Sequence, residues 1–134
     1  MGTKIISKTQ IYLFANNNMY VCADGGRNNI VIANRENPSI WETFTLLKLE
    51  NNKYAISSYA NKLFSADLGS TLEVTALRDE INAWEIFELI PLDNGYVAFK
   101  AGKNKYLTLD EKTAQIYASA SAIGKNERFL MIIK

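Results

Sequence analysis

Short apolar segments alternate with polar turns along the whole chain, and within each segment the apolar residues recur at every second position. A period of two is typical of a half-buried β-strand, whereas an amphipathic helix repeats every third or fourth residue. No segment has a convincing helical period or capping sequence, and 121–124 could form a single turn at most. The pattern predicts twelve strands, at residues 11–14, 20–23, 30–34, 42–49, 54–57, 63–66, 73–77, 85–89, 97–100, 106–109, 115–118 and 127–133.

These segments form three copies of one unit, at about residues 8–50, 51–93 and 94–134. Each copy has an acid after its second strand, an alanine in its third and a phenylalanine in its fourth. A repeat at fixed spacing sets the architecture before any local assignment does. The landmarks, spaced by 42 or 43 residues, are Asp24, Asp67 and Asp110, then Ala33, Ala76 and Ala118, and then Phe44, Phe87 and Phe129.

Three four-stranded units favour a single all-β domain, the β-trefoil, over residues 1–134. Four strands per unit would also fit a propeller blade, but propellers typically need at least four blades. A closed barrel with a cap of three hairpins buries the apolar faces and leaves few open strand edges. The alanine held at one place in all three units predicts tight packing near the axis. The acids are most simply turn residues.

Composition narrows the possible functions. The chain has 15 basic and 14 acidic residues and a formal net charge of +1, which gives no reason to expect a nucleic-acid partner. No apolar run approaches the roughly 20 residues of a membrane span. Residues 1–7 lack the apolar region of a secretory signal, so we expect a cytoplasmic protein unless the chain is part of a secreted enzyme.

The same composition offers little catalytic chemistry. There is no histidine, the commonest metal ligand and general base, and the single cysteine, Cys22, fits a buried strand position. Paired carboxylates remain as a possible catalytic device, but the acids recur with the repeat, whereas catalysis needs two groups in different environments. We therefore expect a monomeric non-enzyme without a cofactor or metal.

At residues 20–44 the pattern Y-V-C-A-D-G-G-x-x-x-x-x-I-A-N-R, followed by W-E-T-F, closely resembles the fascin-like β-trefoil repeat. It looks in particular like the modules appended to bacterial β-glucanases and related glycoside hydrolases. The resemblance covers all three units and is weakest in the third, where Asn126 replaces the tryptophan and Ser119-Ala120 replaces N-R. The Q-x-W signature of ricin-type lectins is absent. One fold hosts many functions, so the resemblance supports the fold better than the function.

Two tryptophan–glutamate pairs stand at equivalent places in the first two units. The C–H groups of a sugar ring pack on an aromatic plane, and its hydroxyl groups need a directional acceptor, which a carboxylate supplies. In the glucanase modules that the chain resembles, the repeat tryptophan and glutamate are implicated in glucan binding. The resemblance therefore implies ligand-binding roles for Trp41, Glu42, Trp84, Glu85 and Glu127.

A structural interpretation of the same residues stays open. Each tryptophan could close the base of the barrel, and each glutamate could accept backbone N–H groups of the adjoining loop. Glu127 persists where the tryptophan does not, which favours a structural role for the glutamates. Arg35 and Arg78 also recur: each could bind a sugar hydroxyl or pair with the acid that follows it, and a solvated surface pair contributes little.

Two functional hypotheses follow. The first is a non-catalytic, lectin-like carbohydrate-binding module, for β-glucan, with up to three shallow sites. Several weak sites on one rigid body raise the avidity for a polymer without any new contact. The alternative is a fascin-like module that binds actin or another protein. The near-neutral charge and single module suit actin bundling less, because bundling needs two binding faces.

Overall fold

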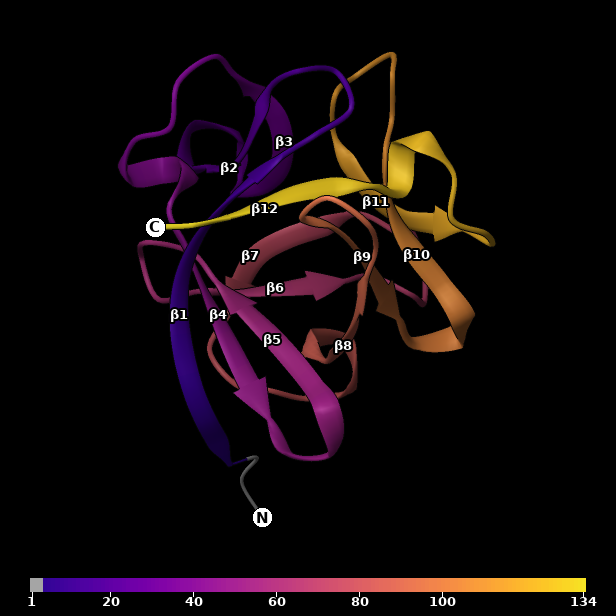
Figure 1. The fold of residues 1–134 in the computed structure, drawn as a ribbon. Coiled ribbons are helices and arrows are strands. Elements are labelled where there is room, and N and C mark those ends of the chain that lie inside the picture. The colour runs from indigo at the N-terminus through magenta and orange to yellow at the C-terminus, as the bar shows by residue number, and fades with distance from the viewer. Residues whose placement is uncertain (1–3) are drawn as a thin grey trace.

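The computed structural model describes residues 4–134, and it is a β-trefoil of twelve strands joined by turns and six 3₁₀ segments (Figure 1). Within these residues no helix has the length and apolar character needed to cross a membrane. The strands are β1 (Ile5–Phe14), β2 (Tyr20–Asp24), β3 (Ile30–Arg35), β4 (Phe44–Leu49), β5 (Lys53–Ser57), β6 (Leu63–Ala66), β7 (Val74–Arg78), β8 (Phe87–Pro91), β9 (Tyr96–Ala101), β10 (Lys105–Leu109), β11 (Ile116–Ala120) and β12 (Phe129–Ile133). The 3₁₀ segments are η1 (Gly25–Arg27), η2 (Ile40–Glu42), η3 (Glu50–Asn52), η4 (Ala83–Glu85), η5 (Gly102–Asn104) and η6 (Lys125–Glu127).

Six strands close into a barrel. Antiparallel pairing runs from β1 to β4, β5, β8, β9 and β12, and β12 pairs back with β1. The closure brings the C-terminal strand beside β1, where the Lys134 N–H donates to the Gln10 carbonyl at 2.9 Å (Figure 1). A closed barrel leaves few unpaired strand edges.

The other six strands form three hairpins, β2–β3, β6–β7 and β10–β11, which meet in a cap at one end of the barrel. A ring of backbone hydrogen bonds joins the hairpins. In each, the N–H of the buried repeat alanine donates to the carbonyl of a residue with positive φ in a neighbouring hairpin. These bonds run from Ala33 to Ala114 at 2.8 Å, from Ala76 to Asn29 at 2.9 Å and from Ala118 to Leu72 at 2.8 Å.

This ring explains the repeated alanine. Ala33, Ala76 and Ala118 are each 0% exposed, because the backbones of neighbouring hairpins approach one another at these positions. A larger side chain would separate the backbone groups that form the ring. The tight packing near the axis that the sequence predicts is therefore confirmed.

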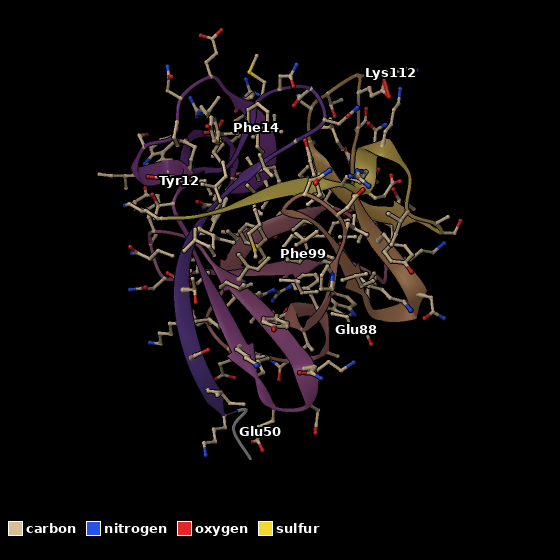
Figure 2. The ribbon with its side chains drawn as sticks, in the orientation of Figure 1. Tyr12, Phe14, Glu50, Glu88, Phe99 and Lys112 are labelled. Atoms are coloured by element: carbon tan, nitrogen blue, oxygen red, sulfur yellow. The ribbon has the colours of Figure 1, made fainter. Side chains whose placement is uncertain are left out.

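The barrel core comes from alternate strand positions, as the period of two predicts. Phe99 of β9 is 1% exposed and points into the interior (Figure 2), and its repeat equivalents Leu13 and Ile56 are also buried. Phe44 and Phe87 begin β4 and β8 and are fully buried. Burying large apolar side chains from all three repeats against one another provides the main favourable term in folding.

The structure differs from the sequence prediction at the strand starts. Glu42, Glu85 and Glu127 were expected to begin the fourth strand of each repeat, but they end the 3₁₀ segments η2, η4 and η6. The expectation that no segment has a capping sequence is wrong for the first repeat, because Ser39 to Glu42 reads S-x-x-E, the sequence of a capping box, and forms one. Strand β1 also begins at Ile5 rather than at residue 11, because its N-terminal half pairs with β4.

We predict that Ala118→Val destabilises the protein by about 1–3 kcal/mol, because the added methyl groups overpack the cap. The neighbouring change Ser119→Val adds the same β-branched shape at an exposed position of β11 and should stay within about 0.5 kcal/mol of the parent. Urea unfolding of the two variants measures the difference. Equal midpoints would contradict the tight cap.

Candidate functional site

The segment that carries each tryptophan–glutamate pair is a 3₁₀ turn held by its own buried carboxylate. Glu42, Glu85 and Glu127 are 2%, 3% and 9% exposed. In each, Oε1 accepts the backbone N–H of the residue three positions earlier, which satisfies a donor at the start of the turn. The distances are 2.7 Å from Ser39, 2.8 Å from Asn82 and 2.6 Å from Gly124.

The second carboxylate oxygen joins the turn to the second strand of the same repeat. Ser65 Oγ of β6 donates to Glu85 Oε2 at 2.6 Å, and the Thr108 hydroxyl of β10 donates to Glu127 Oε2. The carboxylates of Glu85 and Glu127 therefore each have an internal donor on both oxygens. This geometry agrees with the structural interpretation of the sequence, in which each glutamate accepts a backbone N–H of the adjoining loop.

In the first repeat the second carboxylate oxygen faces an arginine instead of a hydroxyl group. Cys22 occupies the position of Ser65, and Arg35 supplies the positive charge: its Nε lies 3.7 Å from Glu42 Oε2 and donates to Cys22 Sγ at 3.4 Å. A guanidinium nitrogen of Arg35 also lies 3.6 Å from Asp24 Oδ2. Cys22 is fully buried, as expected, and burial raises the pKa of its thiol despite the opposing effect of Arg35.

The pairing of each arginine with the acid that follows it in the sequence does not occur. Among the described residues, Arg35 pairs with Asp24 and Glu42 rather than with the adjacent Glu36. Arg78 makes no ion pair there, and the carboxylate of Asp79, the acid that follows it, binds Lys62. Arg78 is exposed, whereas Arg35 is half-buried, so the two repeat-equivalent arginines differ in how much of their charge reaches solvent.

Trp41 is half-buried and lies against two other segments. Its ring stacks on that of Tyr59, with centroids 6.1 Å apart and an interplanar angle of 16°. The Arg35 guanidinium lies 5.6 Å from the centroid of the indole. The outer edge of the indole lies over Gly25, in the turn between β2 and β3. Sequence analysis missed Tyr59, which belongs to the next repeat.

Trp84 lies over the equivalent turn of the second repeat. A Cβ added at Gly69 would lie only 3.2 Å from the indole, so the ring rests directly on the turn backbone. Gly102 takes the place of Tyr59 in this repeat, and among residues 4–134 no aromatic ring stacks on the indole of Trp84. Trp84 is half-buried, like Trp41, and neither indole is sealed inside the barrel.

The third repeat keeps the contact but loses the aromatic ring. Asn126 Nδ2 donates to Glu111 Oε1 at 2.8 Å, in the turn between β10 and β11. Asn16, the equivalent of Tyr59, donates from its Nδ2 to Asn126 Oδ1 at 3.2 Å. In all three repeats this position therefore lies over the hairpin turn of its own repeat, but only two present an indole.

An open hollow lies beside each indole. The first has a volume of ≈ 540 Å³, and its lining residues include Arg35, Ser39, Trp41 and Glu42. The second has a volume of ≈ 350 Å³ and is lined by Arg78, Asn82, Ala83, Trp84 and Glu85. The structure thus brings together the arginine, tryptophan and glutamate of each of the first two repeats, in equivalent surface depressions.

Other acids have local roles. Asp24 Oδ1 accepts the Gly26 N–H at 3.0 Å, and Asp110 Oδ1 accepts the Lys112 N–H at 2.8 Å, so both are turn acids as expected. Within residues 4–134 no cluster of three or more metal-ligating side chains occurs. The two hollows, which bring together the arginine, tryptophan and glutamate of their repeats, are the candidate site.

Comparisons with known proteins identify the fold. Residues 71–134 match the model of the FRG1-like domain family. No curated protein sequence matches the chain significantly.

Three solved structures share its architecture. The designed three-fold symmetric protein ThreeFoil has a TM-score of 0.81 at 15% identity, over 92% of this chain and 97% of that one. SeviL, solved with the asialo-GM1 saccharide, has a TM-score of 0.76 at 12% identity, over 94% and 98%. The exo-β-1,3-galactanase 1,3Gal43A from Clostridium thermocellum has a TM-score of 0.76 at 11% identity, over 98% of this chain and 31% of that enzyme. At these identities the likeness shows the fold alone.

We predict that Ser65→Ala destabilises the protein by about 1–3 kcal/mol, because the buried Glu85 carboxylate loses its hydroxyl donor. The matched control is Ser70→Ala, an exposed serine in the turn after β6, which should change stability by less than about 0.5 kcal/mol. Urea unfolding midpoints measure both. A Ser65→Ala variant as stable as Ser70→Ala would mean that the second carboxylate oxygen needs no protein donor.

Proposed function

We propose that this β-trefoil is a non-catalytic carbohydrate-binding module and that β-glucan is its polymer. The observation that carries the proposal is the pair of repeat-equivalent hollows, each with one half-buried indole beside an arginine and short polar side chains. Indole faces accept the C–H side of a sugar ring, and the polar groups around them can orient its hydroxyls.

Similar folds support this proposal. SeviL was solved with a saccharide bound, and the galactanase carries a region of this fold within a longer enzyme. A small trefoil beside a glycoside hydrolase is consistent with a module that holds the enzyme on its polymer. Two weak sites on one rigid body would raise the avidity for a chain polymer.

We assign the ligand contacts to Trp41, Trp84, Arg35 and Arg78. The glutamates have a supporting role in this proposal: Glu42 and Glu85 fix the turn from which the preceding tryptophan projects. Both oxygens of Glu85 already accept internal hydrogen bonds, and in Glu42 one oxygen accepts the Ser39 N–H while the other lies 3.7 Å from Arg35 Nε, so a sugar hydroxyl would have to compete with these contacts. A third site at Glu127 would have the Asn126 amide in place of the indole.

The burial of the three repeat glutamates also supports a non-catalytic role. General acid–base catalysis of glycoside cleavage needs two carboxyl groups that face one substrate in different environments. Here the three buried glutamates lie in different repeats, and each is turned toward the 3₁₀ segment that it closes. None of them faces another across a hollow.

We predict that the protein is retarded in affinity electrophoresis on laminarin-type or cellulose-type polymers, and that the Trp41→Ala/Trp84→Ala double variant loses the retardation. Each single variant should retain partial binding, because one hollow remains. The control is Tyr117→Ala, a half-buried aromatic residue in the cap that lines neither hollow. Unchanged retardation of the double variant, or no retardation of the parent on any polysaccharide, would refute the proposal.

The alternative from the sequence, a fascin-like module that binds actin, remains a proposal. Co-sedimentation with actin filaments tests it directly. Pelleting with filaments that is insensitive to both tryptophan changes would favour this alternative over the sugar-binding function.

A further inference from the structure

The two hollows have the same plan but different charge. In the first, the Arg35 guanidinium lies within 4 Å of two carboxylates, Asp24 and Glu42, which neutralise it. In the second, Arg78 is exposed and has no carboxylate within ion-pair distance among residues 4–134. Its guanidinium therefore keeps its donors free beside the indole of Trp84.

The residues that the following repeat places near each tryptophan also differ between the two hollows. Tyr59 covers part of Trp41, whereas its equivalent Gly102 leaves Trp84 without an aromatic neighbour. The next residue is Lys103, where the preceding repeat has Ala60. Lys103 Nζ donates to the Leu68 carbonyl at 3.3 Å, and Leu68 precedes the glycine on which Trp84 rests. A second cation is thus anchored at the turn on which the Trp84 indole rests.

A further hollow, of ≈ 300 Å³, adjoins the second one at Ala83, which lines both. Its walls carry three lysines, Lys53, Lys100 and Lys103, and one acid, Glu88. Figure 2 places Glu88 on the barrel side of the molecule, far from Lys112 in the cap. We call the two adjoining hollows together the basic groove.

The acidic residues of the basic groove do not neutralise all of its cationic side chains. Lys53 Nζ donates to Glu88 Oε1 at 2.8 Å, and this bond, with a smaller contribution from the charge of Lys100, lowers the pKa of the Glu88 carboxyl. Glu85 is buried and turned toward Ser65 and its own turn. Three cationic side chains, Arg78, Lys100 and Lys103, therefore remain without a carboxylate partner among the described residues, in a chain with a net charge of only +1.

We propose that the basic groove binds an acidic saccharide, in which one sugar ring lies on Trp84 and carries a carboxylate or sulfate group toward Arg78. The inference rests on the proposed sugar-binding function and adds a ligand class to one of its two sites. A planar guanidinium matches a carboxylate or sulfate with two parallel hydrogen bonds, and the lysines attract the following anionic units of the polymer. The first hollow, with its arginine neutralised, accepts neutral sugar units.

The test uses the full chain and polymers that differ in one group. Affinity electrophoresis or calorimetry compares laminarin with the same glucan oxidised at C6 to a uronate, and with its sulfated form. The protein should bind the uronate or sulfated form about tenfold more tightly than laminarin, as expected for added charge-assisted hydrogen bonds. The two acidic polymers distinguish which anion is preferred. The preference should fall at high salt, which screens exposed charges.

Substitutions in the basic groove test whether it causes the preference for the acidic glucan. Lys103→Gln should reduce binding of the acidic glucan and leave laminarin binding unchanged, because Lys103 is not one of the proposed contacts for a neutral sugar. Arg78→Gln should weaken binding of the acidic glucan more than binding of laminarin. The matched control is Lys112→Gln, which removes one positive charge from an exposed turn of the third repeat. Equal losses for Arg78→Gln and Lys112→Gln, or no preference for either acidic polymer by a protein that binds laminarin, would overturn this inference alone. A parent protein that binds no polymer would overturn the proposed function itself.

Discussion

A buried carboxylate in each repeat connects the segment that carries the candidate site to the rest of the fold. One oxygen accepts a backbone N–H and closes a single 3₁₀ turn. The other accepts a hydroxyl of the second strand in the second and third repeats and lies 3.7 Å from Arg35 Nε in the first. Without this bond the turn would have no fixed orientation, since so short a segment has almost no stability of its own. The indole projects from the residue before the carboxylate, so the position of the ring depends on a group that is itself nearly inaccessible to solvent.

The pseudo-threefold symmetry holds for the framework and fails for the chemistry displayed on it. The glutamate, the capping hydrogen bond and the cap alanines persist in all three repeats. The residue over the hairpin turn changes from Trp41 to Trp84 to Asn126, and the residue contributed by the next repeat changes from Tyr59 to Gly102 to Asn16. The framework can be the same in every repeat because its polar groups are satisfied internally, whereas the exposed positions are free to differ.

Much of the fold was accessible from the sequence, because it follows from periodicity. Alternation by two and the 43-residue spacing predicted the strands, the β-trefoil and the alanines at the axis. The glutamates were assigned to strands because a three-residue 3₁₀ turn is too short to show a period. The partners of Arg35 and the role of Tyr59 depend on contacts between segments distant in sequence, which neighbour-based reasoning could not find. Comparing the repeats position by position would have revealed the Cys22, Ser65 and Thr108 series.

The ring that joins the hairpins uses only main-chain atoms, and it imposes positive φ on Leu72 and Ala114 as well as on Asn29. Leucine and alanine have little intrinsic preference for that conformation, so the ring determines the backbone there rather than the residue type. The donor positions must stay small, because the hairpins approach closely there, but the acceptors contribute only a carbonyl group and are asparagine, leucine and alanine in the three repeats. The exposed residues of one repeat can therefore be exchanged while its axial alanine is kept, which makes the third repeat a natural place to graft a second copy of the Trp84 surface.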